Sequence, residues 1–386
     1  MKNLKGACMF AQSGGPTSVI NASAAGVFIE ALAQENITKV YGAAHGIKGI
    51  LTESFYDMGQ EDMAELELLK YTPSSALGSV RYKLKDASVD DTDYKRILEV
   101  FKKYDIRYFF YNGGNDSMDT CNKISKFMAN SGYECNVIGV PKTIDNDLFG
   151  TDHCPGYGSA AKYVSTTVME VNLDAKVYDT GMVCIIEVMG RNAGWLTAAS
   201  AYAQAKTGKP HLIYVPERPF VLEDFLAEVR DIYQKEKNCV VALSEGIKDG
   251  QGKLISEGNL DAFGHSQLGG VASYLCGVVE DRLGIKTRYI EMSLLQRCAA
   301  HLASEVDIEE AMACGREALR FALNGETDKM VSIAVTSRQP YHAEYTVVPL
   351  GAVANQVKAL DECYLYPENG KIRPDFVDYV KIFVEK

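Results

Sequence analysis

The chain repeats one local pattern, in which a short apolar strand leads into a glycine-rich or polar loop and then into a helix. The pattern predicts strands over residues 6–11, 39–44, 107–111 and 136–140, and helices over 19–32, 92–103 and 118–130. In an open parallel sheet, the loops that follow the strands meet at the carboxyl edge, where ligands bind. The repeat therefore predicts an α/β fold with mostly parallel sheets.

The second half of the chain continues the alternation. Strands are expected over 182–188, 212–215 and 240–243, and helices over 160–173 and 195–205. A chain of 386 residues exceeds the usual size of one compact core, so two domains are expected. The glycine-containing stretch 150–158 is the expected hinge, and the persistent alternation favours a second α/β domain over a different fold class.

Composition narrows the classes of function. The net charge of −11 and the absence of a basic run argue against a nucleic-acid partner. No run approaches 18 apolar residues and no leader is apparent, so a cytoplasmic protein without a membrane span is expected. The ten cysteines are scattered without a CxxC pair, and the histidines form no HExxH motif, so no structural metal is expected. His265 is read as a structural residue.

The loop after the strand at 136–140 carries the densest chemistry in the chain. Its sequence Pro141–Asp147 offers a cation at Lys142, a hydroxyl at Thr143 and carboxylates at Asp145 and Asp147. Such a set could hold a phosphate and abstract a proton. Taken alone, the same residues could form only a capped turn. The two glycine turns are also ambiguous when each is taken alone. A Gly-Gly turn is often only a tight turn, and Asp116 in the second one could be a helix N-cap.

Taken together, the loops resemble those of the 6-phosphofructokinase family from Gly14 to about Arg320. The matching motifs are Gly14-Gly15, Leu77-Gly78-Ser79-Val80-Arg81, Gly113 to Ser117, Pro141 to Asp147, Met189-Gly190-Arg191, Glu245-Gly246, and Arg288 with Arg297. The resemblance implies two similar three-layer α/β/α domains with the active site in the cleft between them. It assigns residues 1–155 and about 296–350 to a phosphoryl-donor domain, and about 156–295 and 351–386 to a sugar-phosphate domain.

The resemblance also implies roles for single residues. Asp145 matches the general base that takes the proton of the C1 hydroxyl of fructose 6-phosphate, with Thr143, Ile144 and Asp147 beside it. The other implied sugar-phosphate contacts are Met189, Gly190, Arg191, Glu245, Arg288 and Arg297. The implied donor contacts are Gly14, Gly15, Arg81, Gly114, Ser117 and Lys142. Arg288 matches a position supplied by a neighbouring subunit, which implies a homodimer or homotetramer.

Two positions indicate pyrophosphate as the donor. ATP-using members have glycines where this chain has Asp116 and Lys142, and both replacements resemble the pyrophosphate-dependent branch. A carboxylate about 4 Å from an ATP α-phosphate would be repelled by about 4 kcal/mol at an effective dielectric of about 20. The compact ammonium of Lys142 suits the small, highly charged pyrophosphate. Asp116, Lys142, Arg81 and Asp145 are therefore the residues to which the resemblance gives catalytic roles.

The chain departs from the family pattern at a few positions. The resemblance implies Mg²⁺ as the cofactor, but Asn115 replaces an aspartate that other members use toward this ion. Asn115 and Asp116 are the candidate ligands in this chain. Leu294 replaces a sugar-binding histidine, and Met182 replaces a second cross-subunit arginine. The sequence therefore leaves open how the 6-phosphate is held.

Two alternatives remain beside a reversible pyrophosphate:fructose-6-phosphate phosphotransferase. An ATP-dependent 6-phosphofructokinase would differ at Asp116 and Lys142. A catalytically silent sugar-phosphate-binding subunit would lack the general base, whereas this chain has both Asp145 and Asp147.

Overall fold

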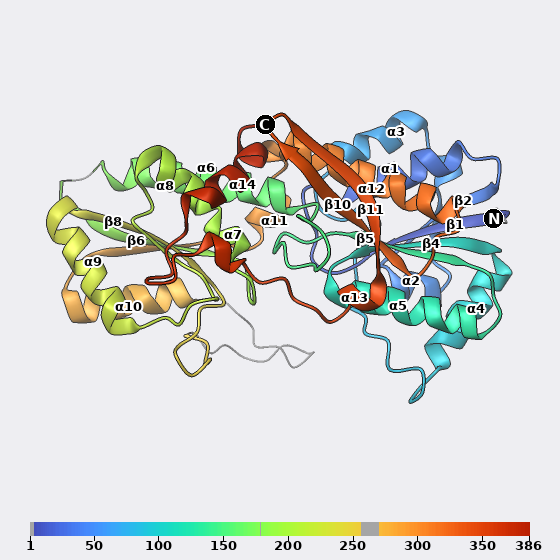
Figure 1. Cartoon of the computed structure of the whole chain (residues 1–386), viewed down its shortest axis with the longest axis horizontal. Coiled ribbons are helices and arrows are strands. Elements are labelled where there is room, and N and C mark those ends of the chain that lie inside the picture. Colours follow the sequence, from blue (N-terminus) through green and yellow to red (C-terminus); the bar gives the residue numbers. More distant parts are fainter. Residues whose placement is uncertain (1–3, 178, 256–269) are drawn as a thin grey trace. The chain divides into compact units, whose positions relative to one another are not determined.

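The computed structural model describes residues 4–177, 179–255 and 270–386 (Figure 1). His265, which the sequence indicated to be structural, lies outside the described residues. Within the described ranges, no helix combines the length and the apolar character needed to cross a membrane.

Contacts between residues divide the chain into two compact units. The first unit comprises Met1–Ile144, Leu148–Ser159 and Arg297–Val357. The second comprises Asp145–Asp147, Ala160–Gln296 and Lys358–Lys386. Each unit has its own sheet and its own buried core, and each is described separately below.

The first unit is built on a seven-stranded sheet of order β11-β10-β5-β4-β1-β2-β3. Its strands are β1 (Gly6–Gln12), β2 (Ile37–Ala43), β3 (Phe55–Asp57), β4 (Ile106–Gly113), β5 (Asn136–Pro141), β10 (Lys329–Arg338) and β11 (Tyr341–Pro349). The inner pairs β1–β2, β1–β4, β4–β5 and β5–β10 are parallel. Only the outer pairs β2–β3 and β10–β11 are antiparallel.

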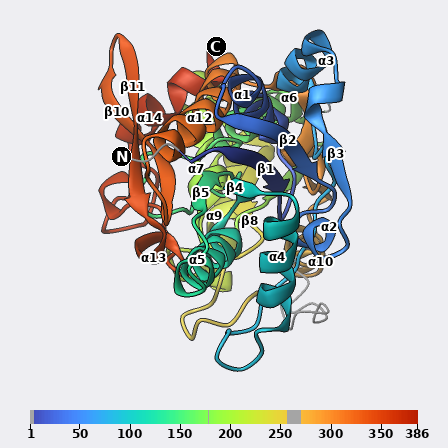
Figure 2. The same ribbon diagram turned by 90° about the vertical axis from the view of Figure 1, so that its right-hand side faces the viewer.

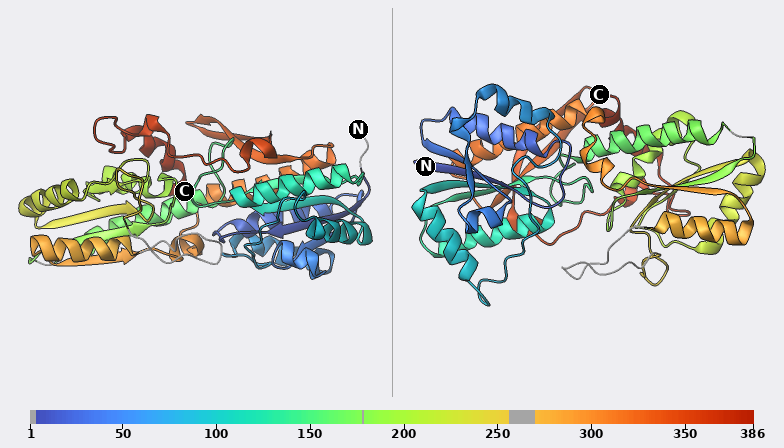
Figure 3. Two further views of the ribbon diagram at one scale, coloured as in Figure 1. Left: turned by 90° about the horizontal axis from the view of Figure 1, so that it is seen from below. Right: turned by 180° about the vertical axis from the view of Figure 1, so that it is seen from behind.

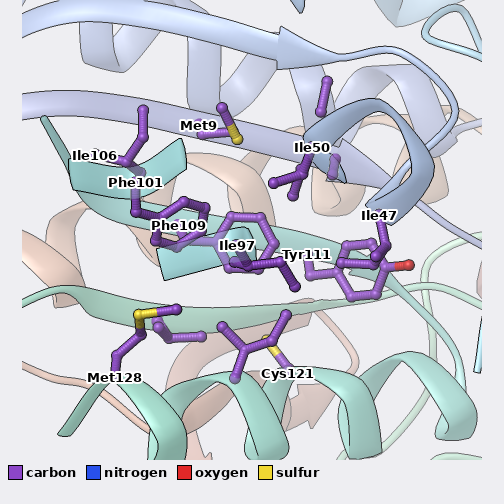
Figure 4. Close-up of a cluster of buried hydrophobic side chains, with 14 of the residues drawn as sticks. Met9, Ile47, Ile50, Ile97, Phe101, Ile106, Phe109, Tyr111, Cys121 and Met128 are labelled. Atoms are coloured by element: carbon purple, nitrogen blue, oxygen red, sulfur yellow. The ribbon is translucent and has the colours of Figure 1, made fainter. Parts of the chain in front are cut away.

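Helices cover both faces of this sheet (Figure 2). They are α1 (Ile20–Leu32), α2 (Ile47–Leu51), α3 (Met63–Leu68), α4 (Thr92–Lys103), α5 (Asn115–Asn130), α12 (Glu305–Leu323) and α13 (Leu350–Val353). On one face, Ile97 and Phe101 of α4 pack on Phe109 of β4 (Figure 4). On the other, Phe28 of α1 packs edge-on against Phe10 of β1. The alternation of side chains along each strand thus supplies two separate cores.

Helices α1 and α12 approach each other closely because glycines stand at their contact. A Cβ added to Gly26 would lie 2.0 Å from the carbonyl oxygen of Met312, and one added to Gly315 would lie 2.0 Å from that of Ser23. Main-chain atoms cannot move aside as a flexible side chain can. Helix α12 also packs on β5 and β10, and its Asp307 bonds to residues 156 and 159, which follow the loop after β5.

The second unit contains a four-stranded parallel sheet of order β7-β8-β6-β9. Its strands are β6 (Met182–Val188), β7 (Leu212–Tyr214), β8 (Asn238–Ser244) and β9 (Thr287–Glu291). Its helices are α6 (Tyr157–Ala175, which begins in the first unit), α7 (Trp195–Ala198), α8 (Ser200–Thr207), α9 (Leu222–Glu236), α10 (Val271–Leu283), α11 (Leu295–Cys298, which ends in the first unit) and α14 (Pro374–Val384). Helices α6 and α10 lie on opposite sides of this sheet (Figure 3).

The carboxyl-terminal segment completes the second unit. Trp195 of α7 packs against Tyr364, Phe376 and Tyr379, three aromatic residues of that segment. The indole Nε1 of Trp195 also donates a hydrogen bond of 2.9 Å to the carbonyl of Lys358. The segment 358–386 therefore contributes buried aromatic side chains, Phe376 and Tyr379 among them, to the core of this unit.

The predicted fold class is confirmed, with local corrections. Helix α5 begins at Asn115 with Gly114 as its N-cap, so Asp116 is a residue of the first turn and not the N-cap. The single helix expected over 195–205 is two helices that meet at Ala199. The stretch 150–158, the expected hinge, directly precedes the point between Ser159 and Ala160 where the chain passes from the first unit to the second, and it is mostly buried and bonded to β10 and α12. The antiparallel hairpin β10–β11 was not anticipated.

The close packing of α1 on α12 predicts a strong effect at Gly315. Replacing Gly315 by Ala should lower stability by about 1–3 kcal/mol, because the added methyl group meets a main-chain carbonyl. The matched control is Gly277→Ala in α10, where an added Cβ meets no described atom within 4 Å. That change should raise stability by about 0.5–1 kcal/mol, since alanine favours the helix. Thermal unfolding of both variants checks this; equal midpoints would contradict it.

Candidate functional site

The first glycine turn follows β1 and is held by a neighbouring segment. Gly14 has a φ of 77°, a conformation that favours glycine. The hydroxyl of Ser79 donates a hydrogen bond of 2.6 Å to the carbonyl of Gly14. The backbone N–H of Gly14 is 3.4 Å from the carbonyl oxygen of Val80. The exposed Arg81 therefore follows a segment that is bonded directly to this turn.

Two buried amides fix that segment, and sequence reasoning did not identify them. The Oε1 of Gln12 accepts hydrogen bonds from the Ser75 hydroxyl and from the N–H of Leu77, at 2.7 and 3.1 Å. Asn21 accepts from the N–H of Ala76 at 2.9 Å and from Gln12 Nε2 at 2.8 Å. The only sequence signal for them is a polar residue at a strand end and another inside an otherwise apolar helix.

The second glycine turn joins β4 to α5. A Cβ added to Gly113 would lie 2.0 Å from the Oγ of Ser117, so glycine lets the Ser117 side chain fold back over the turn. Helix α5 starts at the next residues, and Asp116 is exposed in its first turn. The unsatisfied N–H groups at a helix start favour an anion. A carboxylate at this place therefore competes with a bound anion unless a cation lies between them.

Lys142 connects the two glycine turns. Its backbone N–H donates to the carbonyl of Gly113 at 3.1 Å, and its Nζ donates to the carbonyl of Gly15 at 2.6 Å. The residue is 4% exposed. An ammonium group held this way brings a positive charge to the point where the loops after β1, β4 and β5 meet.

Arg297 lies against the same turn. A Cβ added to Gly15 would be 2.6 Å from Nη1 of Arg297. The residue belongs to the first unit. The first unit therefore brings Gly14, Gly15, Gly113, Lys142 and Arg297 together around one turn.

The next two residues of the loop run beside a returning segment. Thr143 pairs with Gly156 in a parallel bridge, and its N–H donates to the carbonyl of Pro155 at 3.2 Å. Ile144 is only 6% exposed, so its side chain serves packing. The position of the loop therefore depends on where residues 155–156 are held.

Asp145 and Asp147 flank a strained and buried asparagine. Asn146 has a φ of 56° and donates a hydrogen bond of 2.8 Å from Nδ2 to the Tyr379 hydroxyl. The carbonyl of Asp147 accepts from the N–H of Lys358 at 2.8 Å. Both carboxylate residues are partly exposed, while Asn146 is fully buried. Anchoring the central residue leaves the two aspartates at the surface of the second unit.

A second group of candidate residues lies at the ends of β6 and β8. The Oε1 of Glu245 accepts from the N–H of Gly190 at 3.3 Å, and Ser244 Oγ donates to the carbonyl of Gly190 at 2.5 Å. Gln296, which sequence reasoning missed, accepts from the N–H of Met189 at 3.2 Å. The second unit therefore brings Met189, Gly190 and Glu245 together.

Arg191 and Arg288 differ in placement. A Cβ on Gly246 would lie 2.1 Å from the carbonyl of Arg191, so Arg191 stands beside the Glu245-Gly246 turn. Arg288 is exposed on β9, paired in register with Cys184 rather than with the end of β6. The structure of the second unit does not gather Arg288 with the Met189–Glu245 group. Two of the departures from the family pattern also lie in the second unit, where Met182 is buried and Leu294 is exposed.

A buried carboxyl group stands behind this second group. Glu187 of β6 is 5% exposed, and its Oε2 accepts from the N–H of Ala272 at the start of α10, at 2.9 Å. Burial raises its pKa to about 7, and the nearby carboxylates of Glu291 and Glu245 act in the same direction. Glu187 therefore changes charge near neutral pH.

Comparison with known proteins assigns these motifs to one family. The profile of the family described as Phosphofructokinase matches residues 7–322. A protein of Halomonas elongata named pyrophosphate–fructose 6-phosphate 1-phosphotransferase is 46% identical over 362 residues, 92% of this chain and 86% of the relative. A protein of the same name from Xanthomonas campestris pv. campestris is 47% identical over 93% of this chain and 87% of its own.

A solved structure of a similar protein has the same fold as this chain. The pyrophosphate-dependent phosphofructokinase of Marinobacter aquaeolei superposes with a TM-score of 0.88 at 40% identity, covering 98% of this chain and 91% of that protein. Both the sequence motifs and the arrangement of sheets therefore lead to one family.

The buried Glu187 predicts a pH-dependent stability. A carboxyl whose pKa is raised by folding stabilises the protein fully below its unfolded pKa of 4.5, and that contribution is lost as the pH rises to about 7. Glu187→Gln keeps an oxygen acceptor for Ala272 but cannot ionise. Its thermal midpoint should therefore exceed that of the parent protein at pH 8 and not at pH 4.5. Identical pH profiles of the two proteins would rule out this role for Glu187.

Proposed function

Because this chain belongs to the phosphofructokinase family, we propose that it catalyses reversible phosphoryl transfer from pyrophosphate to the C1 hydroxyl of fructose 6-phosphate. The products are fructose 1,6-bisphosphate and phosphate. The observation that carries this proposal is the pair Asp116 and Lys142, which stands at the two glycine turns in place of the glycines of ATP-using members. The relatives from Halomonas elongata and Xanthomonas campestris pv. campestris are named for the same donor.

The proposed donor site is the turn cluster of the first unit. Gly14, Gly15, Gly114 and Ser117 present main-chain and hydroxyl groups to the diphosphate, and Lys142 supplies positive charge from beneath the turn. Arg81 bridges the donor and the transferred group and stabilises charge as it spreads over the phosphoryl oxygens. The buried position of Lys142 supports this reading, because an ammonium held in place needs no reorganisation when charge moves.

Enzymes of this family generally need a divalent metal, and we propose Mg²⁺. Mg²⁺ is typically held by one or two protein oxygens together with substrate phosphates, and it neutralises charge on those phosphates. The exposed carboxylate of Asp116 and the amide oxygen of Asn115 fit that requirement at the start of α5. Among the described residues, no group of three or more His, Cys, Asp or Glu side chains could hold a metal ion.

The proposed acceptor chemistry rests on the 142–147 loop. Asp145 takes the proton of the C1 hydroxyl as that oxygen bonds to phosphorus, while the bond from phosphorus to the leaving phosphate breaks. Thr143 and Asp147 position the hydroxyl and support Asp145, and Ile144 is a further proposed contact with the substrate. The sugar is held by Met189, Gly190, Arg191 and Glu245, and its 6-phosphate by Arg297 and by Arg288 of a neighbouring chain.

The oligomeric state and location are also proposals. Arg288 stands away from the Met189–Glu245 group of its own unit, which supports its use by another copy in a homodimer or homotetramer. We place the donor site in the domain of residues 1–155 and about 296–350. The sugar-phosphate site is in the domain of about 156–295 and 351–386. A cytoplasmic location suits both substrates.

A donor assay tests the proposed function directly. Purified protein should convert fructose 6-phosphate with pyrophosphate at saturating Mg²⁺, and ATP should replace pyrophosphate poorly. Asp116→Gly should relieve the repulsion of a nucleotide phosphate, worth about 4 kcal/mol at about 4 Å, and should weaken use of pyrophosphate. Asp116→Asn is the matched control, because it removes the charge and keeps the bulk. Preference of the parent protein for ATP would show the donor assignment to be wrong.

Substitution of Lys142 tests whether this residue acts in pyrophosphate binding or in the chemical step. Lys142→Gly should reduce kcat with pyrophosphate more than it raises KM, because the lysine meets charge that moves during transfer. A rise in KM with kcat unchanged would make Lys142 a ground-state anchor instead. Circular dichroism and the thermal midpoint of the variant show whether the contact with Gly15 is needed for folding.

Variants of Asp145 and Arg288, studied alone and mixed, test both the proposed general base and the proposed site shared between two chains. Asp145→Ala should lower kcat by roughly 10²–10⁴-fold while fructose 6-phosphate still binds. Arg288→Ala should be nearly inactive as well. Mixing the two variants under conditions of subunit exchange should restore activity, because one kind of site then carries both native residues. No recovery after confirmed exchange would contradict a site completed by a neighbouring chain.

A further inference from the structure

Segment 151–159 follows the 142–147 loop and is fixed to α12 by buried charged groups. Asp307 of α12 accepts hydrogen bonds from the N–H of Gly156 at 2.8 Å and from the N–H and hydroxyl of Ser159 at 2.8 and 2.6 Å. One turn further along α12, Glu310 Oε2 lies 2.6 Å from Nε2 of His153. Two carboxylates of one helix thus hold one short segment.

The histidine at the centre of this arrangement is completely buried. His153 is 0% exposed and Glu310 is 4% exposed. The other ring nitrogen of His153, Nδ1, lies 3.0 Å from Oδ1 of Asp152. A histidine between two carboxylates is stable as an imidazolium, which donates from both nitrogens.

Charged and hydroxyl groups from the neighbouring strands complete the cluster. Arg338 of β10 donates from Nη2 to Asp152 Oδ2 at 2.9 Å, and the Tyr341 hydroxyl of β11 donates to Glu310 Oε1 at 2.5 Å. The titratable and charged groups that face His153 directly or through these partners are Asp152, Cys154, Asp307, Glu310, Cys314, Arg338, Tyr341 and Tyr345. Asp152 thus lies between the cations of Arg338 and His153, and Glu310 lies between His153 and the Tyr341 hydroxyl.

The fixed segment in turn holds the loop. Thr143 pairs with Gly156, and its N–H donates to the carbonyl of Pro155. Thr143 is the residue after Lys142 and stands two residues before Asp145 in the chain. Displacement of residues 155–156 would therefore move the main chain that carries the lysine and the aspartate.

We propose that His153 is a positioning residue for phosphoryl transfer, which through its ionic contact with Glu310 keeps segment 151–159 on α12 and so holds the 142–147 loop in its reactive place. Because this contact requires a charged His153, the position of the loop should depend on pH. Burial alone would lower the pKa of His153, but Glu310 and Asp152 more than offset this and raise the pKa to about 9. The stabilising charge is present below the unfolded pKa of 6.5 and is lost as the pH rises through about 9.

The inference rests on the proposed function for its effect on turnover, and its structural part can be tested without any substrate. Glu310→Gln keeps the shape of the side chain and removes its charge. The amide hydrogens of Thr143 and Gly156 should then exchange at least about tenfold faster at pH 8, after correction for changes in global stability. Tyr341→Phe is the matched control, because it removes a hydrogen bond to the same carboxylate and leaves the contact with His153 intact. It should leave these exchange rates within about threefold of the parent.

Kinetics provide the second arm. In Glu310→Gln the pKa of His153 falls, so the alkaline limb of kcat should move to lower pH by about 1–3 units. His153→Gln should have low kcat at all pH values and no limb from this group, with KM for pyrophosphate changed less than kcat. In Tyr341→Phe the limb should stay in place, even if the thermal midpoint drops.

The outcomes separate this inference from the proposed function. If the parent protein fails to use pyrophosphate but Glu310→Gln still loosens Thr143, the positioning stands and the assigned reaction is wrong. If the parent protein is active and folded Glu310→Gln has unchanged exchange at Thr143 and an unchanged pH profile, His153 does not position the loop. Equal loosening by Tyr341→Phe would reduce the cluster to a general stabiliser and would also overturn the inference.

Discussion

The buried ammonium group of Lys142 is the contact on which the first unit's candidate site depends. A charge with 4% exposure is tolerated only where polar groups surround it, and here the carbonyl of Gly15 accepts from it at 2.6 Å. The main chain of the same residue bonds to Gly113. One residue thereby fixes the spacing of three loops. The glycines leave room for neighbouring side chains, Gly14 for Lys142, Gly15 for Arg297 and Gly113 for Ser117.

A layered arrangement surrounds that contact. The Gln12 and Asn21 amides hold the segment before Arg81, Asp307 and Glu310 hold the segment beside Thr143, and Gly315 lets α12 lie close enough to α1. The buried polar side chains among them need the hydrogen-bond partners that they have here, and the glycine needs the close helix contact. The proposed reaction thus relies on exposed groups such as Asp116 and Arg81 that are carried by rigid, fully bonded main chain.

The sequence was sufficient for the fold class and for the family, and insufficient for the supporting contacts. Strands β1, β4, β5 and β6 are mostly apolar and almost wholly buried, and such short apolar runs are visible in the sequence. The helix expected from residue 118 begins at Asn115, because Gly114 is its N-cap and Asp116, the possible cap in the sequence, lies in the first turn. His153, Glu310 and Gln296 were not recognised, because their partners lie far away in sequence and a buried polar residue has no periodic signal.

The position of β10 has a consequence for how the chain is made. Strand β5, which carries the 142–147 loop, pairs with β10 on one side, and Val137 bonds to a residue 190 positions further along. The whole contiguous stretch Ala160–Gln296 of the second unit is therefore synthesised while that edge of β5 has no partner strand. An open, apolar strand edge invites pairing with other chains. During synthesis, β5, which carries the 142–147 loop, is thus complete long before its neighbour β10 is made.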